Sequence, residues 1–260
     1  MNPALRIASL VPSVTELLVA LGLGPCLVAR TGFCVHPAAA LAAVPKVGGT
    51  KDVRLDALQR LAPSHVVVNV DENRLETLDA LRAWGIQVVV THPCSPQDVR
   101  LLIAQLVDAF AGPSGAADEV HRRAAHIDAE LCAELSKTAP RAAVPVPVLY
   151  LIWRSPWMTV ARDTYISRLL ACVGWQTRPD AEGGPHGAAR YPVVVGSEPW
   201  LTEVEQVLLS SEPYAFTRTH VSQAQALCPR ARVRLVDGEA LSWYGVRTAP
   251  GLRYLRQLLG

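Results

Sequence analysis

The sequence predicts an α/β protein of two α/β lobes with parallel sheets, joined by one long backbone helix, with a ligand cleft between the lobes. Two observations carry this prediction. Short β-branched runs alternate with amphipathic stretches along most of the chain, and a longer helical stretch divides this alternation into two similar halves. Strands separated by helices favour parallel sheets, because a parallel connection needs a crossover. We expect an N-terminal lobe at 1–112, a bridging helix at 113–138 and a C-terminal lobe at 139–260.

The bridging helix is predicted from Pro113 to about Lys137. Its apolar residues recur every three or four positions, at Val120, Ala124, Ile127, Leu131 and Leu135. This spacing places one apolar stripe along a helix. Pro113 suits a first helical turn, Ser114 suits a cap, and Ala139-Pro140 ends the helix. The alternative is an ordinary core helix within a single domain.

The N-terminal half shows four strand and helix pairs. We expect strands at Ile7–Leu10, Leu27–Thr31, His65–Val70 and Ile86–Thr91, and helices at Val14–Leu21, Leu55–Leu61, Asn73–Trp84 and Pro96–Phe110. Ser13 and Glu16 have the spacing of a capping box at the first helix.

The C-terminal half repeats the alternation with a long interruption. We expect strands at Val146–Trp153, Val207–Ser210 and Val233–Val236, and helices at Thr164–Cys172, Thr217–Leu227 and Ala249–Leu259. Residues 175–200 lack periodicity and contain Gly183-Gly184-Pro185, so they are predicted to form a surface loop.

Composition limits the classes of function. Half of the residues are hydrophobic, 18% are charged and the net charge is +2 with scattered arginines, which argues against a nucleic-acid surface. No apolar run approaches the roughly 18 residues of a membrane span. Six cysteines without close pairing predict free thiols. The start of the chain shows no signal-peptide pattern, so we expect a cytoplasmic location, or a periplasmic one if an upstream leader was omitted. We also expect a monomer.

The loops of the N-terminal half contain cysteines and histidines at Cys34, His36, His92 and Cys94. These residue types are zinc ligands, yet each pair is separated by a single residue, which matches no common zinc site, so we predict no metal site. An enzyme is the alternative function, with Cys34 as nucleophile and His36 or His92 as base in a hydrolase or metal-dependent reaction. No oxyanion loop or third member is recognisable, and we predict no catalytic residues and no cofactor.

The C-terminal half contains two short segments rich in tryptophan and arginine. Trp153–Met158 follows a predicted strand, and Ser242–Arg247 precedes the last helix. Flat aromatic side chains beside guanidinium groups fit a large planar or anionic ligand. The predicted ligand-binding residues of these segments are Arg154, Trp157, Met158, Trp243, Tyr244 and Arg247. The alternative is that the tryptophans fill the core and the arginines pair with acids.

Four segments carry a resemblance to a known family. Arg6–Glu16, Pro37, Val47–Gly49 and the strand entry Pro63–Val67 resemble the cobalamin- and siderophore-binding family of ABC-transporter substrate-binding proteins. The resemblance extends from residue 6 to about 257 and implies two α/β lobes joined by one helix. It implies a binding protein and not an enzyme. The ligand would be a corrinoid such as cobalamin, or an iron chelate, and the protein would work with an ABC permease.

The resemblance also implies roles for individual residues. Phe33 and His36 would contact the ligand from the first lobe, Trp157 and Met158 from the second, and Trp243 and Arg247 from the last loop. Glu72 and Glu212 correspond to acids that face the permease arginines. The chain departs from the family's secreted members in lacking a leader pattern, and the segment Tyr191–Gln206 is altered.

Overall fold

The computed structural model describes residues 5–138 and 144–259, which form two compact units. Unit 1 contains residues 5–93, 97–131 and 244–246, and unit 2 contains residues 94–96, 132–138, 144–243 and 247–259. Each unit has its own hydrophobic core and its own parallel sheet. The prediction of an α/β fold with two parallel sheets is confirmed, and the division at 1–112, 113–138 and 139–260 stays a prediction.

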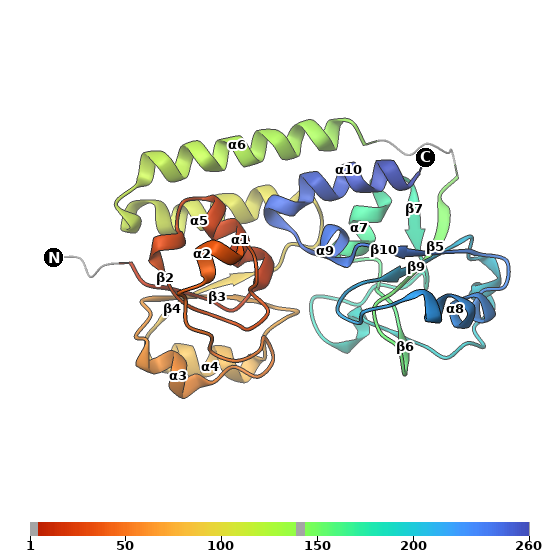
Figure 1. The fold of residues 1–260 in the computed structure, drawn as a ribbon, viewed down its shortest axis with the longest axis horizontal. Helices are drawn as coiled ribbons and strands as arrows, with labels where there is room; N and C mark the ends of the chain where they lie inside the picture. Colours follow the sequence, from red (N-terminus) through yellow and green to blue (C-terminus); the bar gives the residue numbers. More distant parts are fainter. Residues whose placement is uncertain (1–4, 139–143, 260) are drawn as a thin grey trace. The chain divides into compact units, whose positions relative to one another are not determined.

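The sheet of unit 1 has four parallel strands in the order β2-β1-β3-β4 (Figure 1). The strands are β1 (Ile7–Ser9), β2 (Leu27–Arg30), β3 (His65–Asn69) and β4 (Gln87–Thr91). Val66 and Val68 of β3 pack with Leu58 and Leu81 in one apolar cluster. Val67, between Val66 and Val68, is buried as well, so the valine run of β3 forms a strand that is buried on both faces of the sheet, as is usual for parallel strands. All four predicted strands are confirmed within two residues at either end.

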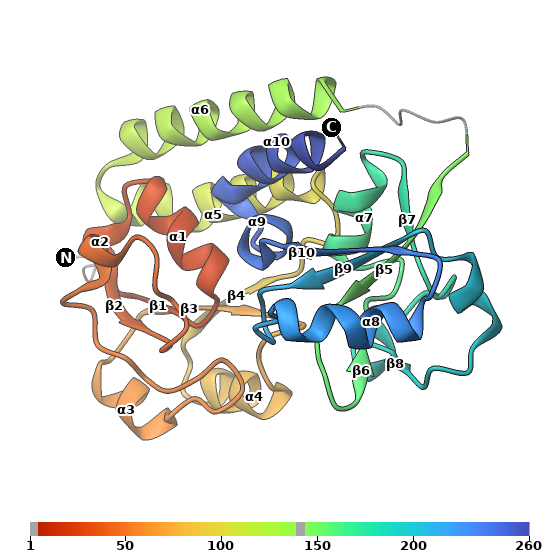
Figure 2. The same ribbon diagram turned by 45° about the vertical axis from the view of Figure 1, so that its right-hand side comes forward.

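Five helices lie wholly within the described part of unit 1. They are α1 (Pro12–Ala20), α2 (Ala38–Leu41), α3 (Leu55–Arg60), α4 (Leu75–Ala83) and α5 (Asp98–Ser114). A short 3₁₀ turn at Gly24–Cys26 precedes β2. In Figures 1 and 2, α3 and α4 lie on the face of the sheet opposite to α1 and α5. The predicted capping box is wrong: α1 begins at Pro12, and no side chain caps it. The proline needs no hydrogen bond for its nitrogen at this position.

The long helix α6 runs from Ala117 to Ser136, so the predicted start at Pro113 is wrong. Pro113 and Ser114 end α5 instead, and Gly115 interrupts the helical run with a φ of 73°. This left-handed conformation suits glycine and commonly ends a helix. The predicted apolar stripe is fully buried at Val120, Ala124 and Leu131 and half-buried at its other two positions. The boundary of the units falls after residue 131, within this helix. The predicted stop at residues 139–140 lies outside the described residues.

The sheet of unit 2 has four parallel strands in the order β10-β9-β5-β7. The strands are β5 (Val146–Leu151), β7 (Trp175–Thr177), β9 (Gln206–Ser210) and β10 (Arg232–Val236). A separate pair, β6 (Trp157–Met158) and β8 (Val193–Val194), is antiparallel. The prediction of a loop over 175–200 is wrong, because β7 and β8 fall within it. Strands of two or three residues are too short to show periodicity, and pairing with β5 and β6 defines them.

The helices of unit 2 follow its strands. They are α7 (Tyr165–Ala171), α8 (Val221–Leu227), α9 (Gly238–Ser242) and α10 (Thr248–Leu258). Short 3₁₀ turns of unit 2 occur at Ala188–Arg190, Pro199–Glu203 and Arg218–His220. A further 3₁₀ turn, Gly245–Arg247, begins in unit 1 and ends in unit 2. Figures 1 and 2 show α7 and α10 on one side of the sheet and α8 on the other. Within the described ranges, every helix is too short or too polar to cross a membrane.

Candidate functional site

Three loops of unit 2 follow neighbouring strands of its sheet. The segment 152–156 follows β5, the segment 211–217 follows β9, and Asp237 follows β10. Because β10, β9 and β5 are adjacent and parallel, their carboxyl ends lie at one edge of the sheet. Ligands of α/β folds commonly bind at this edge. The loops that meet there therefore define the candidate site of unit 2.

Four aromatic side chains from two of these loops and from the start of β6 form a continuous group, the aromatic cluster (Trp153, Trp157, Tyr214 and Phe216). Trp157 stacks on Phe216 at a centroid distance of 5.9 Å and an interplanar angle of 11°. Tyr214 lies 4.8 Å from Phe216, and Trp153 lies edge-on to Tyr214 at 5.6 Å. Phe216 is buried, whereas 41% of Trp153 is exposed. The cluster thus has a buried base and an accessible side.

The positively charged guanidinium group of Arg154 lies over one ring of the cluster. Its guanidinium carbon lies 4.4 Å from the centroid of the Trp157 ring. Its Nε donates to Gln223 Oε1 at 2.9 Å, and its Nη1 donates to Ser155 Oγ at 2.9 Å. Throughout residues 5–138 and 144–259, Arg154 has no carboxylate partner. The remaining N–H groups of this guanidinium are therefore available to an anionic ligand.

In the second predicted segment, Ser242–Arg247, the tryptophan and the arginine bind acidic side chains of the protein itself. Trp243 is buried, and its Nε1 donates to Glu212 Oε2 at 2.9 Å. Arg247 lies 4.9 Å from the Trp243 ring and pairs with Glu239 at 2.6 Å. This geometry matches the alternative in which a tryptophan fills the core and an arginine pairs with an acid. The ligand-binding roles of Trp243 and Arg247 stay predictions.

Glu212, a predicted docking acid, is half-buried on the loop after β9. Burial raises the pKa of its carboxyl, and the hydrogen bond from Trp243 opposes this shift. The negative charges of Glu239 and Asp237 raise the pKa further, whereas Arg247 lowers it. Glu212 is therefore a hydrogen-bonded acid beside the candidate site.

The loop after β2 in unit 1 presents apolar side chains. Phe33 is 62% exposed, Val35 is 43% exposed and His36 is half-buried. Buried Arg30 holds this loop, since its Nη1 donates to the carbonyl oxygen of Cys34 at 2.9 Å. Phe33 is thus accessible, as its predicted ligand contact requires.

Cys34 lies buried beneath the same loop. Its sulfur is 3.1 Å from Thr31 Oγ1, and burial raises the pKa of its thiol. A buried thiol that holds its proton is a poor nucleophile. Cys34 therefore lacks the properties that the enzyme hypothesis requires of it.

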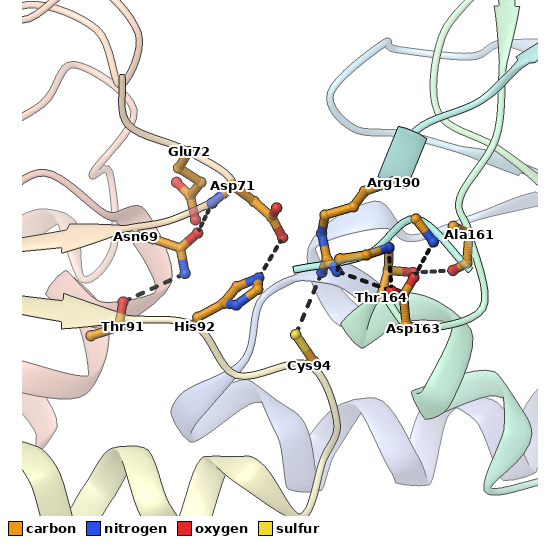
Figure 3. A network of polar contacts seen from close by, with 12 residues as sticks. Asn69, Asp71, Glu72, Thr91, His92, Cys94, Ala161, Asp163, Thr164 and Arg190 are labelled. Carbon is orange, nitrogen blue, oxygen red and sulfur yellow. Dashed lines mark hydrogen bonds and ion pairs between the residues drawn. The ribbon is translucent and has the colours of Figure 1, made fainter. Parts of the chain in front are cut away.

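A polar network follows β3 and β4 of unit 1 (Figure 3). Asn69 Oδ1 accepts from the Asp71 backbone N–H at 2.8 Å, and Asn69 Nδ2 donates to Tyr244 Oη at 2.9 Å. Asp71 Oδ2 lies 3.4 Å from His92 Nε2. Tyr244, a predicted ligand residue, is therefore buried and hydrogen-bonded within unit 1.

Glu72, the other predicted docking acid, belongs to the same network. Its Oε1 accepts from the Tyr244 hydroxyl at 3.4 Å. Burial raises the pKa of Glu72 to about 7, and Asp71 adds to this, whereas Tyr244 and Lys51 oppose it. Glu72 is half-buried, so its docking role stays a prediction.

Cys94 belongs to unit 2 and contacts a buried arginine (Figure 3). Arg190 is 1% exposed, and its Nη2 donates to Cys94 Sγ at 3.5 Å. Its Nη1 lies 3.6 Å from Asp163 Oδ2. Among the residues described, no three histidine, cysteine or acidic side chains are grouped to hold a metal ion. The absence of a zinc site stays a prediction.

The family model described as periplasmic binding protein matches residues 7–190 of the chain. The chain belongs to this periplasmic binding protein family. The resemblance inferred from the sequence is therefore confirmed. The family consists of substrate-binding proteins and not of enzymes, so the enzyme alternative is not supported.

Curated relatives match most of the chain. A vitamin B12-binding protein of Vibrio cholerae is 26% identical over 219 residues, which cover 84% of this chain and 72% of the relative. A vitamin B12-binding protein of Vibrio campbellii is 28% identical over 221 residues, with the same two coverages of 84% and 72%.

Solved structures share the fold over nearly the whole chain. The periplasmic vitamin B12 binding protein of Vibrio cholerae has a TM-score of 0.74 at 20% identity and covers 99% of this chain and 98% of its own. A periplasmic heme binding protein of Pseudomonas aeruginosa has a TM-score of 0.74 at 20% identity, covering 97% of this chain and 91% of its own. At these identities the likeness shows the fold alone.

Proposed function

We propose that this protein binds a flat metal chelate, a corrinoid or an iron porphyrin, as the substrate-binding protein of an ABC transporter. The aromatic cluster beneath Arg154 is the observation that carries the proposal. Relatives named for vitamin B12 and neighbours named for heme support the same ligand class.

The physical argument rests on ring area and charge. The rings of Trp157 and Phe216 are nearly parallel and stack on each other, and Tyr214 and Trp153 continue the aromatic surface from them. A large ring system that packs against the accessible side of this cluster gains roughly 1 kcal/mol per aromatic contact beyond the area it buries. Arg154 supplies a charge that orients an anionic or amide edge.

Titration calorimetry with cobalamin, cobinamide and hemin tests the proposal. Trp157→Ala is expected to weaken binding about tenfold, because it removes stacking area and the support of Arg154. Trp84→Ala is the matched control, because Trp84 is a partly buried tryptophan packed against the core of unit 1, and it is expected to change stability without changing affinity. Failure of all three compounds to bind at micromolar concentration would refute the proposal. Equal affinity in Trp157→Ala would place the site elsewhere.

The contribution of unit 1 is tested by a second variant. Phe33 is the most accessible predicted ligand residue of that unit. Phe33→Ala is expected to weaken binding severalfold, as loss of one exposed aromatic contact should. A variant with unchanged affinity would remove Phe33 and its loop from the site.

The location and the docking partner stay proposals. Free cysteines support the predicted cytoplasmic location, since thiols persist in reducing compartments, whereas the family description is periplasmic. Fractionation of the native host distinguishes the two locations.

We also propose that Glu72 and Glu212 contact an ABC permease. Co-purification that survives Glu72→Gln and Glu212→Gln together would contradict this assignment.

A further inference from the structure

The histidine beside the aromatic cluster is held in one tautomer. The Thr217 backbone N–H donates to His220 Nδ1 at 3.0 Å, as part of a capping box at the turn Arg218–His220. A ring nitrogen that accepts a hydrogen bond carries no proton. The neutral His220 ring therefore carries its proton on Nε2.

This tautomer determines the role of the Tyr214 hydroxyl. His220 Nε2 lies 3.1 Å from Tyr214 Oη, and the two rings are edge-on at 5.4 Å. Since Nε2 is the donor, Tyr214 Oη is the acceptor. The hydroxyl proton of Tyr214 then points elsewhere, and no acceptor for it occurs in the part of the chain that the structure describes. Tyr214 thus carries an unused donor on a half-buried aromatic side chain.

The N–H groups of Arg154 that do not bind Gln223 or Ser155 are further donors at the same cluster. Arg154 lies over Trp157, which stacks on Phe216, and Phe216 contacts Tyr214. One donor is neutral and one is cationic. Hydrogen bonds between such donors and an ionised acceptor are stronger than those between neutral groups. The cluster therefore combines an aromatic face with donors suited to a negatively charged oxygen.

Resting on the function proposed above, we propose that Tyr214, oriented by His220, donates a hydrogen bond to a carboxylate on the edge of the bound chelate. Tyr214 together with Arg154 then selects chelates that carry free carboxylates over neutral ones with the same ring. His220 is a positioning residue in this arrangement, because it acts through Tyr214.

Paired ligands of one ring type test the selection. The probes are hemin and its dimethyl ester, and cobyrinic acid and its heptamethyl ester. The protein is expected to prefer the free acid of the ring it binds. Tyr214→Phe is expected to weaken binding of the acid about tenfold, equivalent to about 1.4 kcal/mol, and to change ester binding less than about twofold. Tyr254→Phe is the matched control, because its hydroxyl accepts from the Asp237 backbone N–H.

The tautomer is tested without any ligand. Long-range proton–nitrogen correlation in nuclear magnetic resonance spectra distinguishes the two neutral forms of His220. A proton on Nε2 supports the proposal, and a proton on Nδ1 overturns it. His220→Phe keeps the ring contact without the N–H, and it is expected to lose the acid preference.

The outcomes separate this inference from the proposed function. If the protein binds one ring type and Tyr214→Phe weakens acid and ester equally, the inference fails and the proposed function stands. If a phenolate-to-iron absorption band disappears in Tyr214→Phe, the hydroxyl binds the metal and the inference also fails. If no probe binds, both fail.

Discussion

The carboxyl of Glu72 is the clearest case in which the surroundings of one residue change its chemistry. Burial raises its pKa to about 7, from an ordinary value of 4.5. Between these two values the unfolded chain ionises Glu72 while the folded chain retains the proton. The unfolded state then binds fewer protons, so stability falls as pH rises through this window and levels off above about 7.

Replacement of Glu72 by glutamine removes this ionisation. We expect Glu72→Gln to gain stability relative to the natural chain as pH rises from 5 to 8, because the natural chain alone loses stability there. Urea unfolding of both proteins at pH 5 and pH 8 measures the difference. Glu76→Gln, at an exposed position on α4, is the control for loss of one carboxyl. A stability difference that is equal at both pH values would contradict the expectation.

Gly183 shows a steric requirement at a single residue. Both oxygens of Asp163 accept backbone N–H groups, from Gly183 and Gly184, at 2.8 Å. This turn approaches Arg190 so closely that a Cβ on Gly183 would lie 2.3 Å from the Arg190 Cα. Backbone atoms cannot move aside as a flexible side chain does. The position therefore requires glycine.

Gly183→Ala is expected to destabilise the protein by about 2–3 kcal/mol through this clash. Gly184→Ala is the comparison, because its φ is 79° but no atom lies within 4 Å of its added Cβ. The left-handed backbone conformation is then the only cost of Gly184→Ala, and it is expected to lower the stability by about 1 kcal/mol. Urea unfolding of both variants tests the order, and a larger loss in Gly184→Ala would overturn the steric argument.

At the scale of elements, the last turn of α6 is bound to α10 within unit 2. Glu134 is 5% exposed and accepts hydrogen bonds from Arg256, Arg253 and Lys137. The hydrogen bond from Arg256 is the main cause that lowers the pKa of Glu134 to about 2. These contacts stabilise the folded state fully above about pH 4.5, the ordinary pKa of the carboxyl, and the stabilisation is lost as the pH falls toward 2.

Glu134→Gln is expected to cost roughly 2 kcal/mol at neutral pH, the size of a hydrogen bond to a charged group. The difference from the natural chain should close as pH falls from about 4.5 toward 2, because the natural carboxyl becomes neutral too. Thermal unfolding across that range measures it. Glu130→Gln on an exposed position of the same helix is the control. A difference that persists near pH 2 would show that charge is not its cause.

The elements that sequence patterns predict are those whose own residues supply the signal. β3 and β4 contain runs of valine, and their predicted bounds differ from the structure by at most one residue. Sequence patterns do not reveal the break at Gly115, because Pro113 and Ser114 also suit a helix start. β7 and β8 were missed because strands so short depend on distant partners for their pairing.

The candidate site was predictable to a similar extent. Trp157 and Arg154 were identified from a segment that concentrates aromatic and basic residues. Tyr214, Phe216 and His220 were missed, although two aromatic residues shortly after a strand were a usable signal. Only the adjacency of β5 and β9 brings these residues to Trp157. Sheet order is a property of tertiary pairing, which local spacing does not contain.

At the scale of the whole molecule, each unit has its own core, so unfolding need not be a single transition. A ligand that binds only the folded state stabilises it by about 2.7 kcal/mol at a free concentration of 100 times Kd. For a chain of this size such a gain corresponds to roughly 5–10 °C in Tm. The gain belongs to the unit whose residues contact the ligand.

Hemin or cobinamide at that concentration is therefore expected to raise the Tm of unit 2, which contains the aromatic cluster. Hydrogen exchange assigns the gain to residues, and amides of β5, β9 and the loop 211–217 should become more protected. In Trp157→Ala, the same ligand concentration should give a smaller Tm shift, because Kd rises about tenfold and the stabilisation falls by about 1.3 kcal/mol. Protection confined to residues 5–93 would instead place the ligand on unit 1 alone and remove the aromatic cluster from the site.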